Sequence, residues 1–146
     1  MENVTERFSS RVADYVSYRP GYPPSLLAYL VEHYGLRSDQ TVADVGSGTG
    51  LLTQLFLKNG NRVNGVEPNA KMRAAAETLL PSYADFTSVD GRAEATTLAT
   101  HSVDWIFAGQ AFHWFDPVAT RREFIRILRA GGRVAFVWND RRMDDP

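Results

Sequence analysis

The stretch that decides the fold is Val42-Ala43-Asp44-Val45-Gly46-Ser47-Gly48-Thr49-Gly50. Its apolar first part predicts a buried strand over Thr41–Val45, and the glycines predict a tight turn into a helix that begins at Leu51. A strand that turns directly into a helix places backbone N–H groups and a helix N-terminus at one point. The stretch therefore predicts a ligand site at the end of the first strand.

A second strand is predicted over Arg62–Glu67, and it ends in a carboxylate. In nucleoside-binding βαβ units, an acidic residue about 20 positions after the glycines accepts hydrogen bonds from the ribose hydroxyls. Glu67 follows the glycine turn at this spacing. Together, the turn and the acid predict a site for an adenosine-type cofactor.

Strands and helices alternate along most of the chain. Helices are predicted over residues 25–35, 51–59, 70–80 and 117–128, and strands over residues 41–45, 62–67, 86–89, 103–108 and 133–138. Asn69 is the predicted N-cap of the third helix, and Gly131-Gly132 the turn into the last strand. The alternation predicts a doubly wound, Rossmann-like α/β fold: a parallel sheet between two layers of helices, with the cofactor above the carboxyl ends of the strands.

Composition narrows the function classes. The chain has 146 residues, a net charge of −1 and no cysteine. Its charge favours neither nucleic acid nor an anionic membrane as partner, and the missing cysteines exclude disulfides, thiolate metal sites and a cysteine nucleophile. The three histidines lack metal-ligand spacing, so no metal is expected. No apolar run reaches the roughly 18 residues of a membrane span, and no signal peptide is evident, so we expect a cytoplasmic protein.

The glycine spacing separates the candidate cofactors. Dinucleotide-binding dehydrogenases use G-x-G-x-x-G, whereas Leu51 stands here at the position of the third glycine. A side chain there would crowd a pyrophosphate, and no Gly-Lys-Ser/Thr follows to make a P-loop. The spacing suits a ligand that carries a carboxylate instead.

At this point the chain resembles the class I S-adenosylmethionine-dependent methyltransferases, and within them the small-molecule branch called methyltransferase type 11. The resemblance runs from about residue 8 to the end. It rests on five motifs in order: Asp44–Gly50, Val66-Glu67-Pro68-Asn69 with Met72, Gly91-Arg92-Ala93-Glu94, Gln110-Ala111-Phe112-His113-Trp114-Phe115-Asp116, and Leu128-Arg129-Ala130-Gly131-Gly132.

The resemblance implies which residues hold S-adenosylmethionine and its product S-adenosylhomocysteine. The amino-acid end would meet the glycine turn, made of Gly46, Ser47, Gly48, Thr49 and Gly50, with Asp44 accepting from the amino group. The carboxylate of this amino-acid end would be stabilised by the partial positive charge of the helix N-terminus.

The nucleoside end would meet a second group of residues. Glu67 would bind both ribose hydroxyls, Pro68 and Met72 would pack near the adenine, and Ala93 would offer its backbone to the adenine edge with Glu94 close by. Family members often carry an acid where this chain has Arg92, which leaves the adenine contact open.

The resemblance also implies residues for the transfer itself. Gln110 would line the methyl-transfer site. A carboxylate acceptor needs no base, whereas a hydroxyl acceptor does, and His113 is then the candidate. Alternatively, His113 packs as part of an aromatic lid. Arg19 either belongs to a cover over the cofactor or packs on the surface.

The resemblance further implies a division of the chain. Residues 1–35 would form a helical cover segment, and residues 36–146 an incomplete cofactor domain. The family sheet normally adds an antiparallel hairpin after the fifth strand. We therefore expect five strands here and an open hydrophobic edge that is capped by another chain or drives self-association.

The leading hypothesis for function is methyl transfer to a small-molecule carboxylate or hydroxyl. The alternatives are a non-catalytic cofactor-binding or oligomerising module and, third, an NAD-dependent oxidoreductase.

Overall fold

A computed structural model describes residues 21–109 and 115–137. Within these ranges, helices and strands alternate as predicted. Their bounds are α3 Pro24–Tyr34, β1 Thr41–Val45, α4 Leu51–Lys58, β2 Arg62–Val66, α5 Ala70–Leu79, β3 Phe86–Val89, β4 Val103–Ala108, α6 Pro117–Ile127 and β5 Leu128–Phe136. Arg19, Gln110 and His113, and with them the expected base and transfer contacts and residues 1–20 of the expected cover segment, lie outside the described residues.

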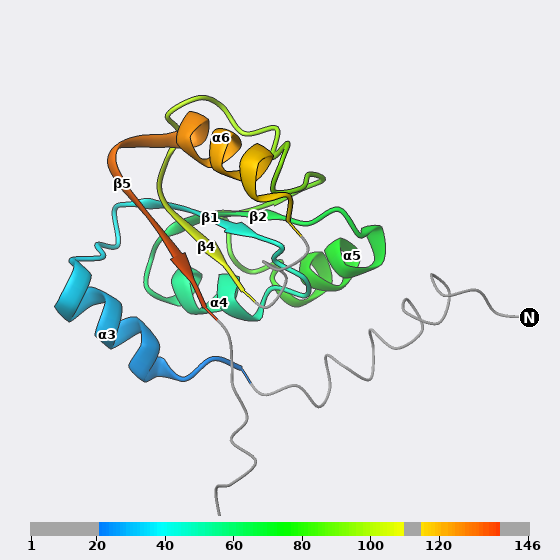
Figure 1. The fold of residues 1–146 in the computed structure, drawn as a ribbon. Coiled ribbons are helices and arrows are strands. Elements are labelled where there is room, and N and C mark those ends of the chain that lie inside the picture. The colour runs from blue at the N-terminus through cyan, green and yellow to red at the C-terminus, as the bar shows by residue number, and fades with distance from the viewer. Residues whose placement is uncertain (1–20, 110–114, 138–146) are drawn as a thin grey trace, which may run out of the picture.

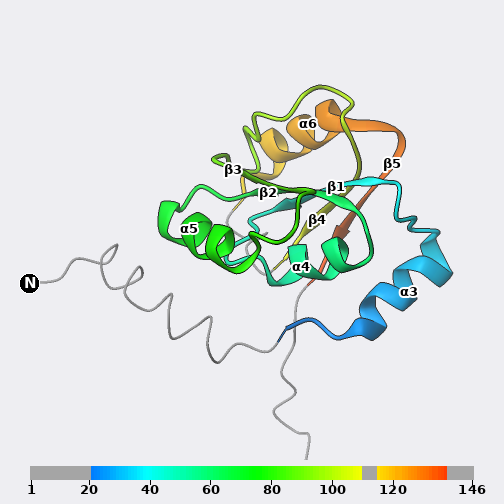
Figure 2. The same cartoon turned by 180° about the vertical axis from the view of Figure 1, so that it is seen from behind.

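The strands form one parallel sheet in the order β3-β2-β1-β4-β5. The chain runs outward from β1 to β3 and then returns to the other side of β1, so the topological switch point lies between β1 and β4. Figures 1 and 2 show α6 over one face of the sheet and α3, α4 and α5 over the other. The predicted three-layer, doubly wound α/β fold is confirmed.

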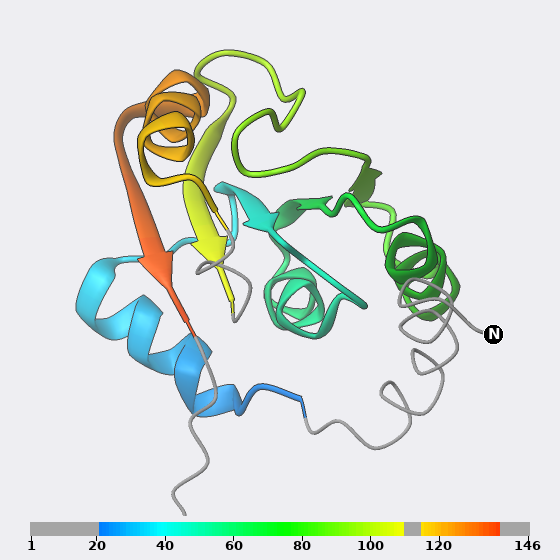
Figure 3. The ribbon, with the colours of Figure 1, turned by 45° about the vertical axis from the view of Figure 1, so that its right-hand side comes forward.

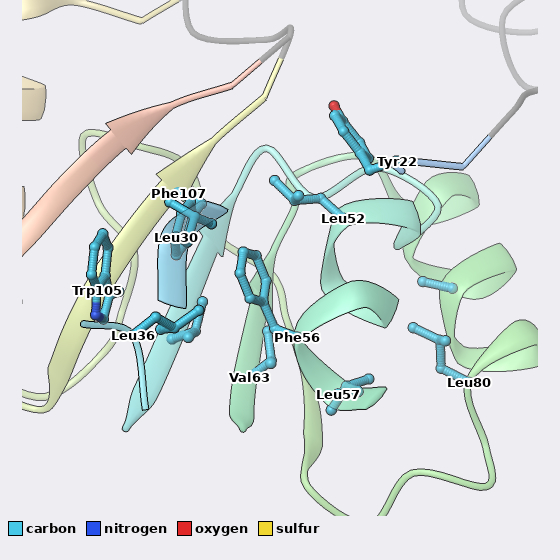
Figure 4. Close-up of a cluster of buried hydrophobic side chains, with 12 residues drawn as sticks. Tyr22, Leu30, Leu36, Leu52, Phe56, Leu57, Val63, Leu80, Trp105 and Phe107 are labelled. Atoms are coloured by element: carbon cyan, nitrogen blue, oxygen red, sulfur yellow. The ribbon is translucent and has the colours of Figure 1, made fainter. Parts of the chain in front are cut away.

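Each face of the sheet has its own core. Val42 of β1 faces the α3–α4–α5 layer, whereas its neighbour Ala43 faces α6, because successive side chains of a strand alternate. Phe56 of α4 packs on Phe107 of β4, with ring centroids 4.3 Å apart (Figure 4). These residues are fully buried, which anchors α4, and with it the preceding glycine turn, on the sheet.

The largest difference from the prediction is the last strand. It was expected from Arg133, but β5 begins at Leu128, so Gly131-Gly132 lie within the strand rather than before it. Leu128 pairs with Val103 and Arg133 pairs with Trp105, so the residues between them bulge out of the ladder. Gly131 has φ +80°, a conformation that a glycine allows in such a bulge. β5 also ends at Phe136, two residues before its predicted end, whereas the ends of the other helices and strands differ from their predicted positions by one residue at most.

Candidate functional site

Three strand ends meet at one edge of the sheet. Val45 pairs with Val66, and Val66 pairs with Val89, so the segments that follow β1, β2 and β3 start side by side. The Glu67 N–H donates to the Val89 carbonyl at 3.0 Å, which extends this alignment by one residue. The glycine turn, Glu67 and the loop after β3 therefore form one continuous edge, as the sequence predicted for a cofactor site.

The glycine turn depends on left-handed backbone conformations. Gly46, Gly48 and Gly50 have φ values of +74°, +59° and +92°. A Cβ on Gly48 would meet nothing within 4 Å, so the space in front of this residue is open to a ligand. A Cβ on Gly50 would lie 2.8 Å from Cδ1 of the buried Leu80, so this glycine lets α4 approach α5.

Glu67 connects the turn to the next helix. Its Oε1 accepts from the Gly48 N–H at 2.9 Å, and its Oε2 accepts from the Asn69 N–H at 2.9 Å. Asn69 in turn caps α5 as predicted, because its Oδ1 accepts from the Met72 N–H at 2.9 Å. A carboxylate offers about four lone-pair positions, so Glu67 retains acceptor capacity for the hydroxyls of a sugar.

The backbone N–H groups that remain available to a ligand lie further along the chain than the glycine pattern suggested. The N–H groups of Gly46 and Ser47 both donate to the Val66 carbonyl, at 2.8 and 3.1 Å, and that of Gly50 donates to the Ser47 carbonyl. Helix α4 has no side-chain cap at Gly50, so its first-turn amides point at the edge without a capping partner. The Thr49 hydroxyl, on a residue that is 1% exposed, also lacks a hydrogen-bond partner among the described atoms.

Asp44 is held from α4. It is 1% exposed, and its Oδ2 accepts from the Thr53 hydroxyl at 2.7 Å. Thr53 itself is fully buried. A buried carboxylate needs such donors, so α4 fixes the orientation of Asp44 at the carboxyl end of β1.

Arg73 of α5 contacts the segments that follow β2 and β3. Its Nη1 donates to the carbonyls of Glu67 and Pro68, both at 2.9 Å, and to Asp90 Oδ1 at 3.2 Å. One guanidinium thus ties α5 to the ends of both β2 and β3. Pro68 is exposed and Met72 is half-buried beside this cluster.

Beyond Asp90, the loop after β3 carries the predicted adenine contacts. Ala93 is 1% exposed, whereas Arg92 is exposed. The Glu94 Oε1 accepts from the Asp116 N–H at 2.9 Å, at the start of α6. Asp116 caps α6 through the Ala119 N–H at 3.0 Å. The loop is therefore linked to the helix that follows the Gln110–Asp116 motif.

Sequence reasoning missed Glu123 of α6. Its Oε2 accepts from the N–H and the hydroxyl of Thr96, at 2.8 and 2.6 Å, and its two oxygens accept from Arg126 at 2.7 Å each. The Arg126 guanidinium and the Thr96 donors lower the pKa of Glu123 to about 2. The i,i+3 spacing of Glu123 and Arg126 could have predicted their ion pair, but no pattern in the sequence indicates Thr96 as a partner.

The described residues include no group of three or more His, Asp or Glu side chains placed to hold a metal ion. In the same part of the chain, no helix has the length and apolar character to cross a membrane.

This geometry defines a Rossmann-like α/β protein whose candidate site lies at the carboxyl ends of β1, β2 and β3. A family profile described as a methyltransferase domain matches residues 43–136. The chain belongs to this family, the class I S-adenosylmethionine-dependent methyltransferases, as the motifs indicated.

Individual relatives agree. An uncharacterized methyltransferase of Mycobacterium tuberculosis is 37% identical over 134 residues, which cover 92% of this chain and 52% of that protein. A solved structure described as a type II methyltransferase from Anaeromyxobacter dehalogenans is 31% identical, with a TM-score of 0.73, over 88% of this chain and 52% of that one.

A second similar structure holds a ligand. Geranyl diphosphate C-methyltransferase from Streptomyces coelicolor was solved with S-adenosyl-L-homocysteine, and it has a TM-score of 0.68 at 21% identity over 78% of this chain and 43% of that one. The chain spans about half the length of the curated relatives it matches.

Proposed function

We propose that the protein binds S-adenosylmethionine at this edge and transfers its methyl group to a small-molecule carboxylate or hydroxyl. The observation that carries the proposal is the position of Glu67 between the open glycine turn and the loop after β3. Family membership supports the choice of this cofactor over NAD, the third hypothesis.

The order of the strands gives the cofactor a direction. An amino-acid tail lies at the end of β1, where Asp44 offers a carboxylate to its amino group and the first-turn amides of α4 face its carboxylate. The sugar then lies at Glu67, at the end of β2, and the base at the loop that contains Ala93 and Glu94, after β3. Gly46, Ser47, Gly48, Thr49 and Gly50 line the tail, and Pro68 and Met72 flank the base.

The residues present fit this cofactor. Gly48 leaves open space where a side chain would project, the buried Thr49 hydroxyl has no hydrogen-bond partner among the described residues, and Glu67 has spare acceptor positions. When bound, S-adenosylmethionine supplies an electrophilic methyl group, so the protein has to orient the acceptor and exclude water.

For the residues around the methyl acceptor we propose the roles that the sequence predicted. Gln110 lines the transfer site, His113 serves as base for a hydroxyl acceptor, and the cover segment, residues 1–35 with Arg19, closes over the cofactor domain of residues 36–146. His113→Asn should lower turnover of a phenol and leave S-adenosylhomocysteine affinity and turnover of a carboxylic acid unchanged. Equal turnover of the phenol by both proteins would remove the base role.

Calorimetry tests the function as a whole. We expect the chain to bind S-adenosylhomocysteine, and to bind NADH no better than an unrelated nucleotide. Methyl transfer is then assayed with S-adenosylmethionine and a panel of small acids and phenols. Binding without transfer to any acceptor would favour the non-catalytic binding module, whereas tight NADH binding without S-adenosylhomocysteine binding would refute the proposal.

We also propose self-association through β5. In the described sheet this strand has a neighbour on one side only, and Val134 is 38% exposed. An apolar groove of about 630 Å³ separates β5 from α3, and one of about 520 Å³ separates it from α6. Light scattering should show a dimer or larger species, and a monodisperse monomer would contradict this. We also propose that the protein is located in the cytoplasm. Disulfides rarely persist there, and a chain without cysteine does not depend on them for stability. Cell fractionation tests this location.

A further inference from the structure

The connection from β3 to β4 has no helix of its own. Residues 90–102 are all described and contain only short turns, such as the reciprocal bonds between Arg92 and Ala95 at 3.1 and 3.0 Å. A crossover between parallel strands usually contains a helix, which satisfies its own backbone groups. This connection therefore needs partners from elsewhere.

Helix α6 is hydrogen-bonded to this connection along its whole length and supplies partners to its backbone from the middle and the end. At its start, the Asp116 N–H donates to Glu94; in its middle, Glu123 accepts from Thr96; at its end, the carbonyls of Arg126 and Ile127 accept from the N–H groups of residues 101 and 102, at 2.9 and 2.8 Å. Figure 3 shows the connection arching beside α6. The helix thus takes over the supporting role of a crossover helix.

The middle anchor is the strongest of these. Glu123 is 8% exposed and accepts two hydrogen bonds from Thr96, while Arg126 keeps it charged. The next residue, Thr97, has φ +68°, which is unfavourable for a β-branched side chain and persists only where the surrounding contacts determine it. The two hydrogen bonds from Thr96 to Glu123 therefore determine the path of the loop between β3 and β4 near Thr96.

We propose that Glu123 is a positioning residue for base recognition: through Thr96 it holds residues 91–96 in the conformation that reads the adenine edge. This inference rests on the proposed function, because the base lies at this loop only if the sugar is bound by Glu67. Glu123 does not touch the cofactor itself, so it should act on base discrimination rather than on contacts to the tail.

The test compares two ligands that differ only at the base. S-adenosylhomocysteine and its inosine analogue differ by the exchange of the 6-amino group for an oxo group. The chain of 146 residues should prefer the adenine form by about tenfold or more, the equivalent of one hydrogen bond. In Glu123→Gln we expect this ratio to fall to within about threefold, mainly because adenine binding weakens.

Asp104 provides a matched control. Its Oδ2 also accepts from a backbone N–H, that of Thr41, and from an arginine, Arg129, both at 2.9 Å. It lies at the opposite ends of the strands, far from the base. Asp104→Asn should lower the melting temperature without changing the ratio of the two affinities.

A second pair of variants separates positioning from folding. Thr96→Val removes the hydroxyl and should lower the ratio, whereas Thr96→Ser keeps the hydroxyl and should restore it. Retention of the full ratio in both Glu123→Gln and Thr96→Val would overturn the inference, and so would equal binding of the two ligands by the unmodified chain. Failure of the unmodified chain to bind either ligand would instead overturn the proposed function.

Discussion

Replacing Glu67 with glutamine tests the centre of the site. The carboxylate accepts from the N–H groups of Gly48 and Asn69, both at 2.9 Å. Glutamine keeps one acceptor oxygen and places an amide NH2 opposite the other donor, so one bond is lost and the second loses its charge. Hydrogen bonds to a charged group contribute about 1.5–3 kcal/mol each when buried. Since Glu67 is only half-buried, we expect a loss of about 1–2 kcal/mol, or roughly 3–8 °C in melting temperature.

The effect on ligand binding should be larger. If Glu67 accepts from both ribose hydroxyls, the substitution removes about 2–4 kcal/mol of binding, which weakens S-adenosylhomocysteine affinity about 30- to 1000-fold. Calorimetry with this ligand and with its 2′-deoxy analogue resolves the cause. The unmodified chain should bind the 2′-deoxy ligand more weakly, whereas Glu67→Gln should bind both ligands with similar affinity.

Glu77→Gln is the control for this experiment. Glu77 is exposed on α5, and its carboxylate has no ion pair or hydrogen bond among the described residues, so neither stability nor affinity should change. S-adenosylhomocysteine affinity of Glu67→Gln within about threefold of the unmodified chain would refute the ribose role. An unchanged melting temperature would refute the stabilising bridge between the turn and α5.

Three further predictions concern stability. Glu123 has a pKa lowered to about 2, so its contribution to the free energy of unfolding is complete above about pH 4.5 and is lost as the pH falls toward 2. Denaturation measured as a function of pH should show a loss of about 1–3 kcal/mol, allowing for solvent screening of its arginine partner. The variant Glu123→Gln should lack this pH dependence. Thr53→Val removes the buried donor to Asp44 and should cost about 1–3 kcal/mol in urea denaturation, whereas a cost below about 0.5 kcal/mol would contradict this role. Gly50→Ala should cost about 2–4 kcal/mol, because φ is +92° and the new Cβ meets a buried leucine; a melting temperature equal to that of the unmodified chain would show that the turn relaxes freely.

Local chemistry made much of the site predictable. The bounds of β1, β3 and β4 match the prediction. β4 shows the reason most clearly, because its nearly continuous apolar run is typical of a buried parallel strand. The Asn69 cap follows from a short-range rule of the same kind. The place of Glu67 after β2 follows from its spacing of about 20 residues from the glycine turn.

The features that escaped prediction depend on contacts between distant segments. The bulge in β5 arises because Leu128 finds a partner in Val103, and a glycine pair in sequence looks the same whether it makes a turn or a bulge. The bond from Gly48 to Glu67 spans 19 positions, and that from Thr96 to Glu123 spans 27. Hydrophobic periodicity places such side chains on an element but does not select their partners.

These long-range bonds have a common physical cause. A glycine turn and a crossover without a helix both leave backbone N–H groups outside any regular ladder, and such groups are costly when they are shielded from water. Glu67 satisfies the N–H group of Gly48 in the glycine turn, and Glu123 satisfies that of Thr96 in the crossover. The irregular backbone that makes room for a ligand thus requires charged acceptors nearby. Because those acceptors come from neighbouring elements, ligand affinity and the stability of this edge of the sheet should change together whenever one of them is replaced.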